Sequence, residues 1–388
     1  MNIDSSEVCQ CNTFGVTTTT HPTSEPAVIE QLSTLDRFLP VWILAAMGVG
    51  IGLGTLIPRL NHGLSSVQIT GTGTSLPIAI GLLVMMYPVL ARVRYEELGR
   101  LRAEKRLFVS SLVLNWLIGP ALMFTLAWLL LPDQPAYRTG LIIVGLARCI
   151  AMVLIWSELA CGDRDATAVL VAINSLFQIA AYSLLGYVYI TLLPRWLGLH
   201  SHGFDIGLWP VTRTVLIFLG IPLLAGFLTR RLGLRAKGRA WYEQRFLPRI
   251  GPLALYGLLF TIVVLFALQG HQITHHPLDV VRIALPLLAY FAVMFSVSFA
   301  GGRALGLGYE RTATLAFTAA GNNFELAIAV AIGVFGATSG EALAGVVGPL
   351  IEVPVLVALV YVSLWLRRSF PAVAGRVPTS VGIAGESS

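Results

Sequence analysis

Long stretches without a charged residue are the feature that most limits what this chain can fold into. Residues 38–57 and 107–131 are two such stretches, and each exceeds the roughly 18 apolar residues that mark a candidate membrane span. Only 12% of the residues are charged, against about 25% in soluble domains, and the mean hydropathy is +0.77. The sequence therefore predicts a polytopic membrane protein with lipid as its main solvent.

Reading the apolar stretches between charged or turn-rich breaks predicts an all-α fold of about ten transmembrane helices. The expected spans are 38–58, 75–91, 107–131, 139–159, 167–193, 209–229, 250–268, 280–302, 312–336 and 342–366. An even number of spans places both termini on the same side of the membrane. The remaining polar stretches, 1–37 and 369–388, are expected to be cytoplasmic tails, the first of them disordered, on either side of a transporter domain over 38–368.

The basic residues indicate which side that is. Two connections carry most of the positive charge, and cytoplasmic loops are the ones enriched in Lys and Arg. The first connection holds Arg92, Arg94, Arg100, Arg102, Lys105 and Arg106, and the second holds Arg230, Arg231, Arg235, Lys237, Arg239, Arg245 and Arg249. This pattern predicts a multi-pass protein of the inner (plasma) membrane with both termini cytoplasmic. The net charge of +6 then needs no nucleic-acid partner.

An internal repeat divides the chain. A shift of 174 positions places span four on span nine and span five on span ten, with Cys149 falling on Asn323 and Gln178 on Glu352. Five spans is an odd number, so the second repeat (209–368) enters the membrane upside down relative to the first (38–193). Inverted repeats are typical of secondary transporters, whose sites lie near the midplane where interrupted helices meet.

Ionisable residues inside spans are costly and therefore mark function. Span four carries Arg148 and Cys149, span nine carries Asn322, Asn323 and Glu325, and span ten carries Glu352 between Pro349 and Pro354. The Gly-Asn-Asn segment is poor helix sequence, so span nine is expected to unwind there. Unwound backbone in a membrane must line a protein-enclosed cavity, and all six residues are predicted to line the substrate site.

Four segments strengthen this interpretation: GLARCIAMVLIWSELACGD, NSLFQ, GNNFELAIAVAIGVFG and GPLIEVPVLVALV. They resemble the arsenite efflux permeases of the arsenical-resistance-3 family, within the bile acid/sodium symporter superfamily, and the likeness extends over residues 38–368. The resemblance implies arsenite as the cargo and leaves antimonite open. It implies Cys149 and Glu352 as the functional pair, interrupted crossing helices four and nine, and a core of spans three to five and eight to ten against a panel of the others.

The chemistry of the two residues agrees with this cargo. As(III) is soft and binds thiolates, so Cys149 is the expected arsenic contact, and Glu352 in a poorly solvated site is the expected proton carrier of an antiport. Arg148 or the end of a broken helix would favour the thiolate, although for Arg148 an ion pair with Glu352 or Glu325 is an equal alternative. Glu325 and the two Asn residues could instead cap a broken helix. No cofactor and no metal site is predicted, and the sequence fixes no oligomeric state.

Two alternative functions make different demands on the chain. A sodium-coupled importer of organic anions on the same fold would need no thiol, whereas an intramembrane enzyme would need a catalytic pair that the spans do not supply. The Gly-rich stretch GVGIGLG in the first span mimics a dinucleotide fingerprint, but it lies inside an apolar helix with no preceding strand. Close packing against another helix is the better interpretation of it.

Overall fold

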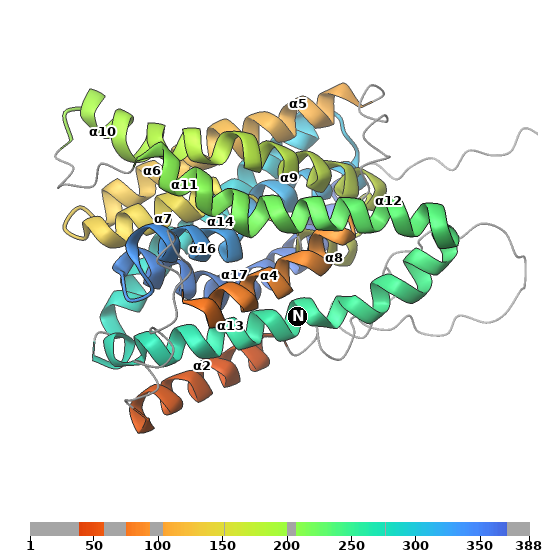
Figure 1. The fold of residues 1–388 in the computed structure, drawn as a ribbon. Coiled ribbons are helices and arrows are strands. Elements are labelled where there is room, and N and C mark those ends of the chain that lie inside the picture. The colour runs from red at the N-terminus through yellow and green to blue at the C-terminus, as the bar shows by residue number, and fades with distance from the viewer. Residues whose placement is uncertain are drawn as a thin grey trace, which may run out of the picture.

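The computed structural model describes residues 39–57, 75–93, 104–150, 152–199, 207–275 and 277–370, and this part of the chain is helical without a β-strand (Figure 1). The tail predicted over 1–37 lies outside the described residues, as do residues 371–388 of the second tail. The first-half elements are α2 (Leu39–Leu56), α4 (Leu76–Ala91), α5 (Lys105–Val113), η4 (Leu114–Ile118), α6 (Gly119–Leu130), α7 (Pro135–Leu146), α8 (Met152–Leu159), α9 (Arg164–Tyr187), η5 (Val188–Leu192) and α10 (Leu193–Trp196). The second-half elements are α11 (Leu208–Val215), η6 (Leu216–Gly220), α12 (Ile221–Trp241), η7 (Tyr242–Phe246), α13 (Leu247–His275), α14 (Pro277–Ala304), α15 (Tyr309–Ala320), α16 (Phe324–Phe335) and α17 (Gly340–Arg367).

Apolar helices of membrane-spanning length account for much of the described chain. Five helical stretches are long and apolar enough to cross a membrane, and three shorter apolar helices accompany them. The long ones are Lys105–Leu130, Arg164–Trp196, Leu208–Leu268, Leu278–Ala304 and Gly340–Arg367. Many large apolar side chains remain exposed on their outer faces, which is the surface that a lipid-embedded protein presents. The protein is therefore a polytopic membrane protein.

The stretch from Leu208 to Leu268 is not one straight helix. Gly238 has φ 79° and ψ 170°, a backbone conformation that favours glycine because a Cβ would clash there. The chain reverses at this residue, so that α12 and α13 form a hairpin that projects beyond the rest of the bundle (Figure 1). The predicted loop after the sixth span is thus helical on both sides of its turn.

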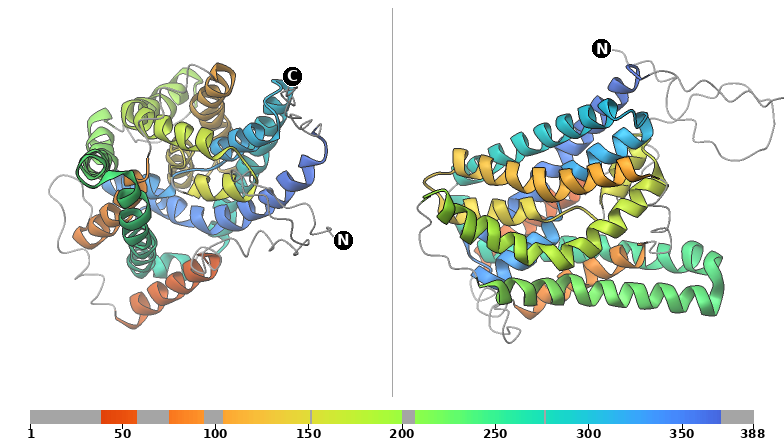
Figure 2. Two further views of the ribbon diagram at one scale, coloured as in Figure 1. Left: turned by 90° about the vertical axis from the view of Figure 1, so that its right-hand side faces the viewer. Right: turned by 90° about the horizontal axis from the view of Figure 1, so that it is seen from above.

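The helices fall into two packed groups. α13 lies against α2 and α4, and α12 lies against α4, while α14, α15, α16, α17, α7 and α6 pack among themselves. The left view of Figure 2 shows α2, α4 and the α12–α13 hairpin gathered on one side of the molecule. α11 continues through η6 into α12 of the first group. Its contacts with α16 of the second group, and with α9, join the two groups.

The glycines of the GVGIGLG stretch explain one of these contacts. A Cβ built on Gly50 would lie 2.6 Å from the carbonyl oxygen of Val263, and one on Gly54 would collide with the carbonyl of Ala267. α2 and α13 therefore approach backbone to backbone, which only glycine permits. This confirms the helix-packing interpretation of the stretch.

The four π-helical turns of the described chain share one cause. Each ends two residues before a proline: Pro120, Pro194, Pro222 and Pro248 follow η4, η5, η6 and η7. Proline has no N–H, and its ring collides with the carbonyl four residues earlier. Widening the preceding turn to π geometry relieves that collision without interrupting the helix.

Candidate functional site

Two of the helical segments are interrupted in the middle of the bundle. α7 ends at Leu146 and is followed by extended backbone at Ala147 (φ −86°, ψ 119°), before α8 resumes the direction of the chain. α15 ends at Ala320, and Gly321 (φ −71°, ψ 142°) begins a second extended segment that leads into α16. The Gly-Asn-Asn segment is therefore unwound, as its sequence predicted.

The two breaks pair with each other through their backbones. The N–H of Cys149 donates to the carbonyl of Gly321 at 3.3 Å, and the N–H of Asn323 donates to the carbonyl of Ala147 at 3.0 Å. Arg148 and Asn322 consequently face each other as an isolated antiparallel bridge. Backbone groups that would be costly to leave unsatisfied in a bilayer are thus satisfied by the opposite break.

Side chains from two further helices complete this pairing. The N–H of Arg148 donates to Oε1 of Gln178 on α9, and the N–H of Asn322 donates to Oε1 of Glu352 on α17 at 3.2 Å. Both acceptors are buried. The sequence predicted Glu352 as a site residue but assigned no role to Gln178 beyond its place in the repeat.

The guanidinium of Arg148 is fully buried and lies between helix ends. Its Nη1 donates to the hydroxyl of Tyr290 at 2.7 Å and to the carbonyl of Ala319 at 3.5 Å, and its Nη2 donates to the carbonyl of Gly145. Gly145 and Ala319 belong to the last turns of α7 and α15. Within the described part of the chain, Arg148 forms no ion pair with a carboxylate, so the predicted pair with Glu352 or Glu325 is not present.

The thiol-bearing residue lies inside the bundle. Cys149 is 3% exposed, and a Cβ built on Gly321 would lie 3.0 Å from its Cβ and 3.6 Å from its Sγ. The side chain thus packs against the unwound backbone of the opposite break. Neither Cys149 nor Glu352, which is 5% exposed, is turned toward lipid.

The two asparagines behave differently. Oδ1 of Asn323 accepts the N–H of Leu326 at 3.0 Å and caps α16, which is the capping alternative raised for this residue. Asn322 is 1% exposed, and among the described residues its amide has no hydrogen-bond partner on either atom. Glu325 lies in the first turn of α16.

Several further polar atoms at the breaks are buried without a partner among the described residues. They are Nε of Arg148, Nε2 of Gln178 and Nδ2 of Asn323, in addition to the Asn322 amide. Buried polar groups are nearly always hydrogen-bonded, so a cluster of exceptions needs an explanation. Such a cluster can bind a small polar solute that both donates and accepts hydrogen bonds.

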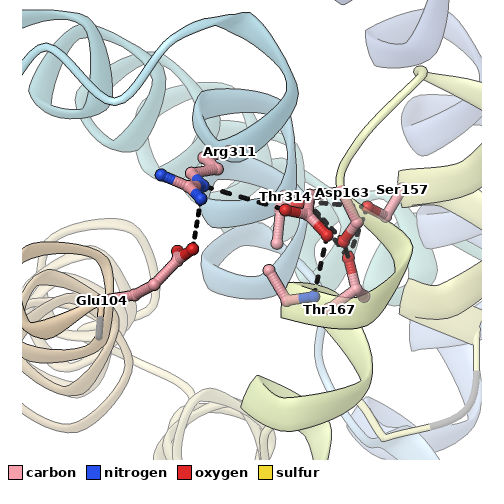
Figure 3. Close-up of polar contacts among 7 residues, drawn as sticks. Glu104, Ser157, Asp163, Thr167, Arg311 and Thr314 are labelled. Carbon is pink, nitrogen blue, oxygen red and sulfur yellow. Dashed lines mark hydrogen bonds and ion pairs between the residues drawn. The ribbon is translucent and has the colours of Figure 1, made fainter. Parts of the chain in front are cut away.

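A separate polar cluster ties the ends of α8, α9 and α15 together (Figure 3). The hydroxyls of Ser157, Thr167 and Thr314 lie 2.7 to 3.2 Å from one another. Arg311 bridges Glu104 and Asp163 beside them. The sequence did not reveal this cluster, because hydroxyl and charged residues are ordinary near helix ends and Thr314 lies within α15.

An apolar helical bundle in which two interrupted helices pair through their breaks is the architecture of a secondary membrane transporter. The model of the Sodium Bile acid symporter family matches residues 79–276, about half of the chain, and the chain belongs to this family. It is accordingly a transporter and not an intramembrane enzyme.

Full-length relatives agree with this assignment. The arsenical-resistance protein Acr3 of Corynebacterium glutamicum is 56% identical over 357 residues, which cover 92% of this chain and 95% of that protein. The arsenical-resistance protein Acr3 of Alkaliphilus metalliredigens is 33% identical over 354 residues, and the uncharacterized transporter slr0944 of Synechocystis is 36% identical over 360. The resemblance to the arsenical-resistance-3 family is thereby confirmed.

Proposed function

We propose that this protein expels arsenite across the cytoplasmic membrane by exchange for protons and so confers arsenic resistance. Two relatives are named arsenical-resistance proteins. The observation that carries the proposal is that Cys149 and Glu352 contact the same unwound segment, one through the carbonyl of Gly321 and the other through the N–H of Asn322. A soft ligand and a proton-carrying carboxyl thus share one buried site.

The cargo explains the unsatisfied polar atoms. Arsenite in neutral water is mainly the uncharged trihydroxide, whose three hydroxyls each donate and accept hydrogen bonds. The amides of Asn322, Asn323 and Gln178 offer their N–H groups as donors, and Oδ1 of Asn322 as an acceptor, without partners among the described residues. A neutral solute also avoids the cost of moving a charge into the membrane.

Cys149 would hold arsenic through a reversible exchange. Its sulfur forms an S–As bond, one As–OH bond breaks, and the departing hydroxide leaves with the thiol proton as water, so that neither sulfur nor arsenic is oxidised or reduced. Water reverses the step and releases the trihydroxide. One thiolate, in place of three, permits turnover because As(III) is not held by several soft ligands at once.

Glu352 would couple this cycle to protons. Its side chain is buried on α17 and accepts the N–H of Asn322 from the unwound segment, so that gain or loss of a proton by the carboxyl acts directly on that segment. Protonation from outside displaces the cargo, and deprotonation toward the cytoplasm restores binding. The proton gradient then drives expulsion through alternating access.

The inverted repeat supports that alternation. The two bridge bonds, Cys149 to Gly321 and Asn323 to Ala147, exchange places under the 174-residue offset, and so do the acceptors Gln178 and Glu352. α7 and α15 also have the same length and obey the same offset at both ends. We infer ten spans in two inverted halves, with the core rocking against the group of α2, α4, α12 and α13.

The orientation follows from the basic hairpin. Arg231, Arg235, Lys237 and Arg239 lie on α12 beyond its apolar part, and basic connections remain cytoplasmic. Both termini are then cytoplasmic as well. Whether antimonite shares the pathway is decided by competition with arsenite in the same assay.

The test is arsenite uptake into everted membrane vesicles with an inward-acid proton gradient. Wild type is expected to accumulate arsenite and to stop when the gradient is collapsed. Glu352→Gln should fall to the level of vesicles without the protein. Glu341→Gln is the matched control, because Glu341 is also buried on α17 but lies eleven residues earlier, about 16 Å along the helix. Uptake that survives gradient collapse would refute antiport.

A sodium-coupled symporter of organic anions is the alternative, favoured by the description of the matching family model. Sodium prefers oxygen ligands and needs no thiol. Cys149→Ser should abolish arsenite transport under the proposed function, whereas a symporter would keep its activity. A Cys149→Ser variant whose transport activity is undiminished would contradict the proposed function and support the alternative.

A further inference from the structure

The interrupted helices bring two helix C-termini together. α7 and α15 end at Leu146 and Ala320, on the two segments that form the bridge. The last carbonyls of a helix have no partner within it and carry roughly half a negative charge. Two such ends meeting in a medium of low dielectric constant favour a positive charge between them.

Arg148 supplies that cation from within the chain. Its guanidinium donates to the carbonyl of Gly145 in the last turn of α7 and to the carbonyl of Ala319 in the last turn of α15. These two carbonyl groups are themselves related by the 174-residue offset, so one guanidinium serves both repeats. The hydroxyl of Tyr290 on α14 completes the shell at 2.7 Å.

The surrounding residues leave room for this arrangement. A Cβ built on Gly119, at the start of α6, would lie 2.8 Å from Nη1 of Arg148 and 3.1 Å from the Tyr290 hydroxyl. Any larger residue at position 119 would displace the guanidinium. On the opposite side of the bridge the residue that corresponds to Arg148 is Asn322, which is uncharged, so the crossing holds one arginine for two helix ends.

In transporters with discontinuous helices, unwound carbonyls and half-helix C-termini are the groups that bind the coupling cation. Here those carbonyls are bound by the guanidinium of a side chain, which cannot diffuse away. We propose that Arg148 is a tethered cation that takes the place of a coupling metal cation at the crossing and makes transport independent of sodium.

This inference deepens the proposed function and rests on it for the cargo, although its central measurement does not. The sodium dependence of thermal stability is measured for purified protein in detergent, in sodium chloride against choline chloride at equal ionic strength. Wild type should melt at the same temperature in both salts. Arg148→Ala should melt earlier in choline and recover in sodium chloride or in millimolar guanidinium.

Transport gives the second readout. Arsenite uptake by Arg148→Ala vesicles should fall about tenfold or more in sodium-free medium, since hydrogen bonds from a charged donor are lost, and should rise again with sodium or guanidinium. Arg138→Ala is the matched control. Like Arg148, Arg138 is a buried arginine that donates to backbone carbonyls. It lies on α7, and its acceptors are the carbonyls of Leu131 and Pro132, beside the ring of Trp128. It should show no cation rescue.

Sodium-dependent uptake or melting of the wild type would overturn the inference, and so would an Arg148→Ala variant that neither sodium nor guanidinium affects. If Arg148→Ala cannot be purified, Gly119→Ala and Arg148→Lys replace it. Gly119→Ala should acquire sodium sensitivity because the new Cβ displaces the guanidinium of Arg148. Arg148→Lys keeps a cation and should not acquire it. The reverse result refutes the role of Arg148 as a tethered cation. Failure of arsenite transport in wild type, with these melting shifts intact, would refute only the proposed function.

Discussion

The hydrogen bond from the N–H of Arg148 to Gln178 offers a direct test of how the bridge is held. Replacing Gln178 by Leu keeps the side-chain volume similar but removes the only side-chain acceptor that the structure gives to this N–H. Gln178 is fully buried, so water cannot take over. A buried donor left unsatisfied costs about 1 to 3 kcal/mol.

That cost converts to a measurable shift. At roughly 2 to 4 °C per kcal/mol, Gln178→Leu should lower the melting temperature of the purified protein by a few degrees. Arsenite transport should fall with it, because Cys149 follows the loosened residue directly. Ser183→Ala is the control on the same helix: Ser183 is buried, and its hydroxyl has no partner among the described residues, so its removal should be neutral.

The corresponding hydrogen bond, from the N–H of Asn322 to Glu352, allows an effect on stability to be separated from an effect on transport. In Glu352→Gln an amide oxygen can still accept the N–H of Asn322, so the melting temperature should stay within about a degree of wild type while transport is lost. If Gln178→Leu melts like Ser183→Ala, or if Glu352→Gln melts as early as Gln178→Leu, the symmetric account of the two acceptors is wrong.

Two further predictions concern parts of the molecule away from the breaks. The pKa of Asp133 lies below its usual value because Arg282 donates a hydrogen bond to it. The ionised Asp133 therefore stabilises the folded protein at pH values above its unfolded pKa of about 3.9. This stabilisation is lost as the pH falls through the lower pKa of the folded state. The difference in melting temperature between wild type and Asp133→Asn should accordingly be constant above about pH 5 and vanish in stronger acid; a difference that persists there contradicts the pairing. Gly54→Ala should cost about 1 to 3 kcal/mol, because its new Cβ meets the backbone of Ala267, whereas Gly52→Ala has open space and should be neutral or slightly stabilising; equal melting temperatures would contradict the close approach of α2 and α13.

The sequence predicted well where the helices lie, because apolar length is the requirement that a bilayer imposes. Every predicted span coincides with helical segments in the structure. It also predicted the unwinding at Gly321, since three successive poor helix formers stand in an otherwise apolar helix. The break after Leu146 has no such composition, and it followed only from the repeat and the resemblance.

The hydrogen-bond partners of individual side chains were harder to predict from the sequence. An ion pair with a carboxylate was one of two alternatives for Arg148, but its guanidinium donates to backbone carbonyls and Tyr290. Carbonyls at helix ends carry no sequence signature, so composition favours the visible carboxylates over them. The π-helical turns could have been anticipated from the prolines, had the collision with the preceding carbonyl been considered.

The mutual bridge also has a consequence for biogenesis. The N–H of Cys149 and the carbonyl of Ala147 are hydrogen-bonded to Gly321 and Asn323, some 170 residues later in the chain. While the ribosome is still translating the second half, the first half is in the membrane with a polar gap in its fourth segment. We expect folding of that segment to wait for the segment around Gly321, and co-expression of severed halves should restore the transport that neither half supports alone.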